Sequence, residues 1–137
     1  MKIDVNKTQI SEALERLRER LPEQPNWIAL ITIDGELIAG TKLTPTIAYR
    51  EEERIGPIVN AFASLAERVH EELKLGKISS IYSVGKSGIL LIRPLESNFI
   101  VALEYGLEQT VSQVSNSEFV FQNELKKLEE LLGENPF

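Results

Sequence analysis

The sequence contains no cysteine and a single histidine. A disulfide framework, a thiolate metal site and a cysteine nucleophile are therefore excluded. Acidic residues outnumber basic ones, and the formal net charge is −6. This charge argues against a nucleic-acid partner and against binding to an anionic membrane surface. No apolar run is long enough for a secretory signal or a membrane span. We therefore expect a cytoplasmic protein with no nucleic acid and no membrane insertion among its interactions.

The clearest positive signal is a hairpin in residues 26–40, NWIALITIDGELIAG. Asp34-Gly35 between two β-prone runs favours a type I′ turn, which would place Thr32 opposite Leu37 and Ile31 opposite Ile38. Both faces of the hairpin are then apolar: one collects Ala29, Ile31, Ile33 and Ile38, and the other collects Ile28, Leu30, Leu37 and Ala39. A sheet that is apolar on both faces needs helices on both faces.

Two helices flank this hairpin in the chain. The first is predicted to begin after an N-cap at Asn6 and to end before Pro22. The second spans 51–75, and Gly56-Pro57 near its front marks either a kink or the true start; we favour a helix that is regular only from about Pro57. Its predicted core stripe is Ile58, Phe62, Leu65, Val69 and Leu73.

The second half of the chain predicts three strands and one helix. The strands span 77–85, 87–94 and 98–105, and the middle one is continuously apolar, as a central strand should be. The polar segment 106–117 is the least ordered stretch by composition. The last helix runs from about Glu118 to Leu132, with Gly133 as its stop.

This order of elements resembles that of the Roadblock/dynein light chain family. The resemblance covers roughly residues 6–132 of a single domain, 1–137, and rests on four segments: ALITIDGELIAG, IVNAFASLAERVHEEL, KLGKISSIYSVGKSGILLIRPL and FIVALEY. It implies an α+β (α/β) fold with a single five-stranded antiparallel sheet covered by helices on both faces, in the order helix-strand-strand-helix-strand-strand-strand-helix. Gly56-Pro57 and the long segment 106–117 depart from the family's usual pattern.

The resemblance also implies a function. Family members are small dimers in which the second helices lie side by side and the third strands pair, and they serve as cofactor-free adaptors or regulators of Ras-like small GTPases, in bacteria of the gliding-motility type. We therefore expect a non-enzymatic homodimer that modulates the nucleotide state or localisation of such a GTPase. The expected dimer interface is Ala61, Phe62, Leu65, Ile78, Ile81 and Tyr82. The expected GTPase-binding residues are Arg54, Glu67, Arg68, Glu71 and Glu72.

No catalytic, cofactor-binding or metal site is expected. His70 lies among glutamates on a predicted helix and is better explained as part of a solvated face than as a metal ligand. An arginine-finger role for Arg50 or Arg54 is less favoured than pairing with the neighbouring glutamates. Two alternatives stay open, namely a sensor module of the PAS or profilin type, which needs an apolar pocket, and a structural scaffold subunit without a GTPase partner.

Overall fold

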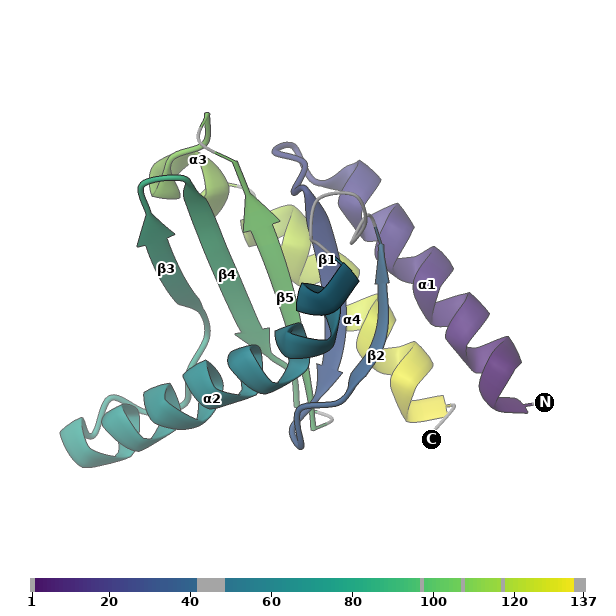
Figure 1. Ribbon diagram of the computed structural model, residues 1–137, viewed down its shortest axis with the longest axis horizontal. Helices are drawn as coiled ribbons and strands as arrows, with labels where there is room; N and C mark the ends of the chain where they lie inside the picture. Colours follow the sequence, from purple (N-terminus) through teal and green to yellow (C-terminus); the bar gives the residue numbers. More distant parts are fainter. Residues whose placement is uncertain (1, 42–48, 97, 107, 117, 135–137) are drawn as a thin grey trace.

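The computed structural model describes residues 2–41, 49–96, 98–106, 108–116 and 118–134 (Figure 1). One five-stranded antiparallel sheet, in the order β2-β1-β5-β4-β3, forms the centre, so the predicted fold class is confirmed. Within the described ranges, no helix is both long and apolar enough to cross a membrane. In chain order the elements are α1 (Lys2–Arg20), β1 (Trp27–Thr32), β2 (Leu37–Thr41), α2 (Tyr49–Leu73), β3 (Ile81–Gly85), β4 (Gly88–Pro94), β5 (Phe99–Tyr105), α3 (Val111–Ser115) and α4 (Glu118–Glu134).

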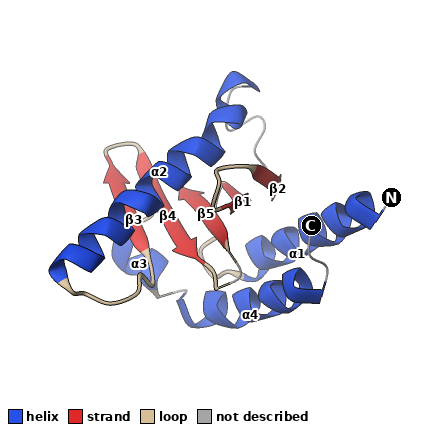
Figure 2. Ribbon diagram, turned by 90° about the horizontal axis from the view of Figure 1, so that it is seen from below, coloured by secondary structure: helices blue, strands red, loops and turns tan. Residues whose placement is uncertain are grey.

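Helices cover both faces of the sheet, as the two apolar faces of the hairpin predict. Helices α1 and α4 lie on one face and α2 crosses the other (Figure 2). The larger core lies under α1 and α4, where Leu14, Phe121 and Leu128 pack against Leu30 and Leu103. The smaller core lies under α2 and is formed by Trp27, Ala29, Ile31, Ile55, Val59, Ala63, Ile92, Ile100 and Ala102.

The β1–β2 hairpin differs from the predicted one in its turn. The Thr32 N–H donates to the Glu36 carbonyl at 2.9 Å, and Gly35, at φ +89°, is the turn residue with positive φ. This is a three-residue loop rather than a type I′ turn, and it pairs Ile31 with Leu37. A bulge at Ile38 then restores the predicted pair of Leu30 with Ala39. Leu37 and Ile38 therefore exchange the faces that were predicted for them.

Two helix ends and one loop segment also differ from the prediction. Helix α1 begins at Lys2, so Asn6 lies inside it and is not an N-cap. Helix α4 continues through Gly133 to Glu134, so this glycine does not end it. The segment 106–117 contains the short helix α3, where the Thr110 side chain accepts from the Gln113 N–H while the Gln113 side chain accepts from the Thr110 N–H. This capping box orders a segment that was predicted to be loose.

Helix α2 is continuous across Gly56-Pro57, so the favoured start at Pro57 is wrong and the longer helix is observed. The loop 42–48 that leads to it lies outside the described residues. Gly56 has a packing reason: a Cβ atom there would lie 2.1 Å from the Gly35 carbonyl oxygen. The helix therefore rests directly on the hairpin turn, and only glycine permits that approach.

Candidate interaction surface

Helix α2 buries a different stripe from the one predicted. Ile55, Val59 and Ala63 face the sheet and are nearly inaccessible to solvent. The predicted core stripe is instead exposed, from 40% for Phe62 to 65% for Leu73. The prediction failed because the helix carries two adjacent apolar stripes, and the narrower side chains pack closer to the sheet. We call the exposed stripe the apolar flank; it consists of Ile58, Phe62, Leu65, Val69 and Leu73.

The C-terminal half of α2 projects past the β3 edge of the sheet (Figure 1). In both ribbon views the last turns of the helix extend beyond β3, and Leu65 and Leu73 are exposed on this half. Contiguous apolar stripes of this kind on a surface helix are typical of interaction sites.

Strand β3 presents an edge with few of the usual protections. Its sequence, IYSVG, has no charge and no proline, and its ladder with β4 runs without a bulge from Ile81–Ile92 to Gly85–Gly88. The opposite edge, β2, carries the bulge at Ile38. Because bulges and charges are how edge strands avoid pairing with other chains, β3 is the edge that is open to a partner.

The six predicted interface residues fall into three places. Ala61, Phe62 and Leu65 are exposed on α2. Ile81 packs with the core on the α2 side of the sheet, whereas Tyr82 packs with the core on the α4 side. Ile78 does not lie in a strand, because β3 begins only at Ile81 and not at the predicted residue 77. The connection turns through Lys74 (φ 56°) and Gly76 (φ +85°), which end α2.

The five predicted GTPase-binding residues are all exposed, and helical spacing divides them into two groups. Arg54, Arg68 and Glu72 point away from the sheet, and we call them the outward charges. Glu67 and Glu71 lie on the side of α2 opposite the apolar flank. There they line a groove together with residues of α4, which sequence reasoning did not bring together.

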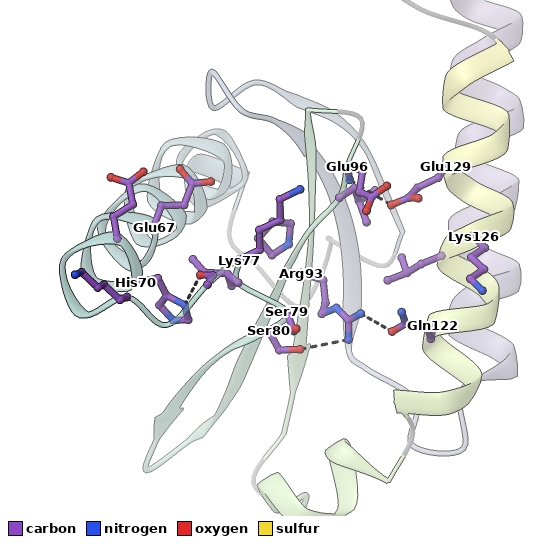
Figure 3. A pocket seen from close by; sticks show the side chains of 17 residues that line it. Glu67, His70, Lys77, Ser79, Ser80, Arg93, Glu96, Gln122, Lys126 and Glu129 are labelled. Carbon is purple, nitrogen blue, oxygen red and sulfur yellow. Dashed lines mark hydrogen bonds between the residues drawn. The ribbon is translucent and has the colours of Figure 1, made fainter.

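This groove, here called the end groove, has a volume of about 990 Å³ (Figure 3). One wall is the C-terminal part of α2, the other is α4 from Gln122 to Glu129, and the floor is formed by residues 78–80 and 93–96. His70 Nδ1 lies 3.2 Å from the Gly76 carbonyl oxygen at one side. Across the described part of the chain, no three histidine, aspartate or glutamate side chains gather as a metal ligand set.

A clear electrostatic perturbation lies away from both surfaces, on α4. Burial alone raises the pKa of Glu124, but the hydrogen bond and charge of Arg20, with the charge of Lys127, outweigh it and lower the pKa overall. Arg20 Nη1 lies 2.9 Å from Glu124 Oε1, and Lys127 Nζ lies 3.5 Å from the same oxygen. This contact joins α4 to α1 and is structural.

Solved structures share this architecture. Myxococcus xanthus MglB matches with a TM-score of 0.73 at 15% identity, covering 91% of each chain. The gliding protein MglB from Thermus thermophilus matches with a TM-score of 0.72 at 13% identity, again over 91% of each chain. A Roadblock/LC7 domain from Streptomyces avermitilis gives 0.68 at 16% identity, over 90% of this chain and 94% of the other. The sequence matches no protein-family model and none of the curated proteins.

These likenesses confirm, at the level of fold, the resemblance that the sequence predicts. The chain has the fold of the Roadblock/LC7 domain and of MglB, and the likeness covers about nine-tenths of the chain.

Proposed function

We propose that this protein is a non-enzymatic, homodimeric adaptor or regulator that binds a Ras-like small GTPase. The observation that carries the proposal is the apolar flank of α2, which lies exposed on a helix that projects beyond its own sheet. The Roadblock/LC7 fold supports the same assignment, because the family resemblance implies GTPase adaptors and regulators.

Two apolar flanks can cover each other when the two α2 helices pair antiparallel. If the helices cross near Leu65, Arg54 of one copy lies near the C-terminal turn of the other, which carries Glu72. The negative end of that helix dipole and Glu72 favour the arginine. This contact supports an antiparallel arrangement.

Strand β3 extends the same interface. With two β3 edges paired antiparallel, the projecting half of each α2 lies over the sheet of the other copy, where Ile81 and Leu90 are only half-buried. The combined contact is expected to bury a standard interface area of roughly 1,200–2,000 Å². The dimer thus covers an exposed helix and an open edge in one step.

In this dimer the outward charges of both α2 helices form one platform. Charges on such a surface steer and select a partner more than they add affinity. A GTPase that docks there would be regulated if the platform binds one switch conformation better than the other, since a ligand shifts an equilibrium only by its differential affinity. No arginine of the platform needs to enter the nucleotide site.

The sensor alternative has less support. A PAS-like sensor needs an apolar pocket between sheet and helices, but that space is filled by two clusters of buried side chains. The end groove lies outside those clusters and carries charged residues on both walls. The scaffold alternative is an outcome of the test below.

The test is binding of a purified Ras-like GTPase, loaded with GDP or with a non-hydrolysable GTP analogue, to the wild type and to Arg68→Glu/Glu72→Lys. Binding should depend on the nucleotide, and the double charge reversal should weaken it by about tenfold while the protein stays dimeric. If neither loaded form of any Ras-like GTPase bound the wild-type dimer, the scaffold alternative would replace the proposal.

A further inference from the structure

The α2 wall of the end groove lies away from the apolar flank. It is formed by Glu67, Glu71 and Lys74, at helical spacing. This side of the helix is opposite the apolar flank, so pairing through the flank does not bury the α2 wall of the groove.

The floor of the groove is held in place by contacts between three segments. Arg93 on β4 is only 8% exposed, and its Nη2 donates to Gln122 Oε1 of α4 at 2.8 Å. Its Nη1 donates to Ser80 Oγ at 3.3 Å, and the guanidinium carbon lies 5.3 Å from the centre of the Phe121 ring (Figure 3). Arg93 therefore ties the floor of the groove to its α4 wall and to the connection at Ser80.

The size and lining of the groove suit a polypeptide better than a small molecule. Its volume of about 990 Å³ stands at the upper limit of small-molecule pockets, roughly 1,000 Å³, but such pockets are mainly apolar. Here the exposed side chains carry both charges, with Lys77 and Lys126 facing the groove alongside Glu67 and Glu71. Complementary binding therefore requires a segment that carries both acidic and basic side chains.

The groove is continuous with the platform. Glu67 and Glu71 each directly precede an outward charge, Arg68 and Glu72, on the same helix. A protein that docks on the outward charges would therefore reach over the rim of the groove. We propose that the end groove is a second docking site, which takes a charged polypeptide segment of the same GTPase partner; this inference rests on the function proposed above.

The chain lacks cysteine, so one engineered thiol can block the groove selectively. Ser79 is exposed and lines the groove, and Ser79→Cys labelled with a bulky maleimide would fill it. Ser112→Cys on α3, labelled in the same way, is the control because Ser112 is exposed elsewhere. The blocked groove should weaken binding of the nucleotide-loaded GTPase by about tenfold or more, and the control should bind as the wild type.

A charge variant gives an independent measurement. Lys126→Glu reverses a charge on the groove wall, whereas Lys127→Glu makes the same change one residue further along α4, outside the groove. Lys126→Glu should weaken GTPase binding several-fold more than Lys127→Glu, with both variants dimeric by light scattering. If the bulky label disturbs the dimer, the comparison of these two charge variants tests the second docking site instead.

The outcomes separate this inference from the proposed function. If the GTPase binds the wild type and is weakened by Arg68→Glu/Glu72→Lys, but binds the blocked groove and Lys126→Glu as it binds their controls, the second site is refuted and the platform stands. If no loaded GTPase binds the wild type, the proposed function fails and the second site fails with it.

Discussion

Gly56 and Gly35 determine how closely α2 approaches the β1–β2 hairpin. In the sequence, Gly56-Pro57 looks like an interruption of a helix, yet the helix runs through it. The glycine is there because the Gly35 carbonyl oxygen occupies the space that a Cβ atom would need. Glycine at this position weakens the helix itself, but it permits the contact that holds the helix on the sheet.

Gly56→Ala should therefore lower the free energy of unfolding by about 1–3 kcal/mol, the usual cost of forcing an extra carbon into a packed site. The expected cause is the contact of 2.1 Å between the new Cβ and backbone, which flexible side chains cannot relieve. Urea unfolding at one fixed protein concentration measures the change.

Gly133→Ala is the matched control. Gly133 lies inside α4, and nothing lies within 4 Å of a Cβ added there. Alanine favours a helix over glycine by up to about 1 kcal/mol, so this variant should be as stable as the wild type or more stable. Equal effects of the two substitutions would contradict the close-packing explanation.

The Arg20–Glu124 pair should make a small, pH-dependent contribution to stability. The pKa of Glu124 is lowered in the folded protein, so its stabilisation is present above the ordinary glutamate pKa and disappears as the pH falls through the lowered value. Arg20→Gln should thus be less stable than the wild type at pH 7 by less than about 1 kcal/mol, because Arg20 is half-exposed.

Unfolding measured from pH 7 to pH 2 checks this linkage. The difference between wild type and Arg20→Gln should shrink once Glu124 is protonated. If the stability difference between the wild type and Arg20→Gln grew on acidification, the Arg20–Glu124 pair would not be the source of that difference.

At the scale of elements, the sequence predicts their type and order but not their ends. Hydrophobic periodicity is strong in every core element, and each predicted helix and strand is present. The ends depend on weaker signals: α1 begins before Asn6, its predicted N-cap, and α4 continues past Gly133, its predicted end. Helix α3 was predictable, because Thr110 and Gln113 have the spacing of a capping box.

The candidate site was predictable in part, for a physical reason. Periodicity shows that α2 has too much apolar surface for one sheet face, but it does not show which stripe faces the sheet. Close packing selected Val59 and Ala63, and left Phe62 and Leu65 outside. The end groove could not be predicted, because Glu67, Arg93 and Lys126 meet only in the folded chain.

The β3 edge yields a prediction that the absence of cysteine makes easy to test. If two β3 strands pair antiparallel about their midpoint, Ser83 of one copy lies opposite Ser83 of the other. Ser83→Cys should therefore form an intermolecular disulfide under mild oxidation, seen on a non-reducing gel. Ser112→Cys on α3 should stay largely uncrosslinked at the same concentration. Equal crosslinking of both variants would point to random collision instead of a paired edge.

At the scale of the whole molecule, two features that a partner could cover lie close together. The projecting end of α2 and the open edge of β3 lie on the same side of the molecule, while α1 and α4 cover the opposite face of the sheet (Figures 1 and 2). One symmetric contact can bury both features. The platform proposed for a GTPase depends on that contact.

The most direct test of this account is the mass of the protein in solution, measured by light scattering after gel filtration at micromolar concentration. The wild type should have the mass of two chains. Leu65→Glu, which puts a charge at the centre of the apolar flank, should have the mass of one chain and keep its helical circular dichroism. Ile33→Glu, a similar change at an exposed residue of the hairpin loop, should remain a dimer. A monomeric wild type, or a Leu65→Glu variant that is still dimeric, would contradict the account.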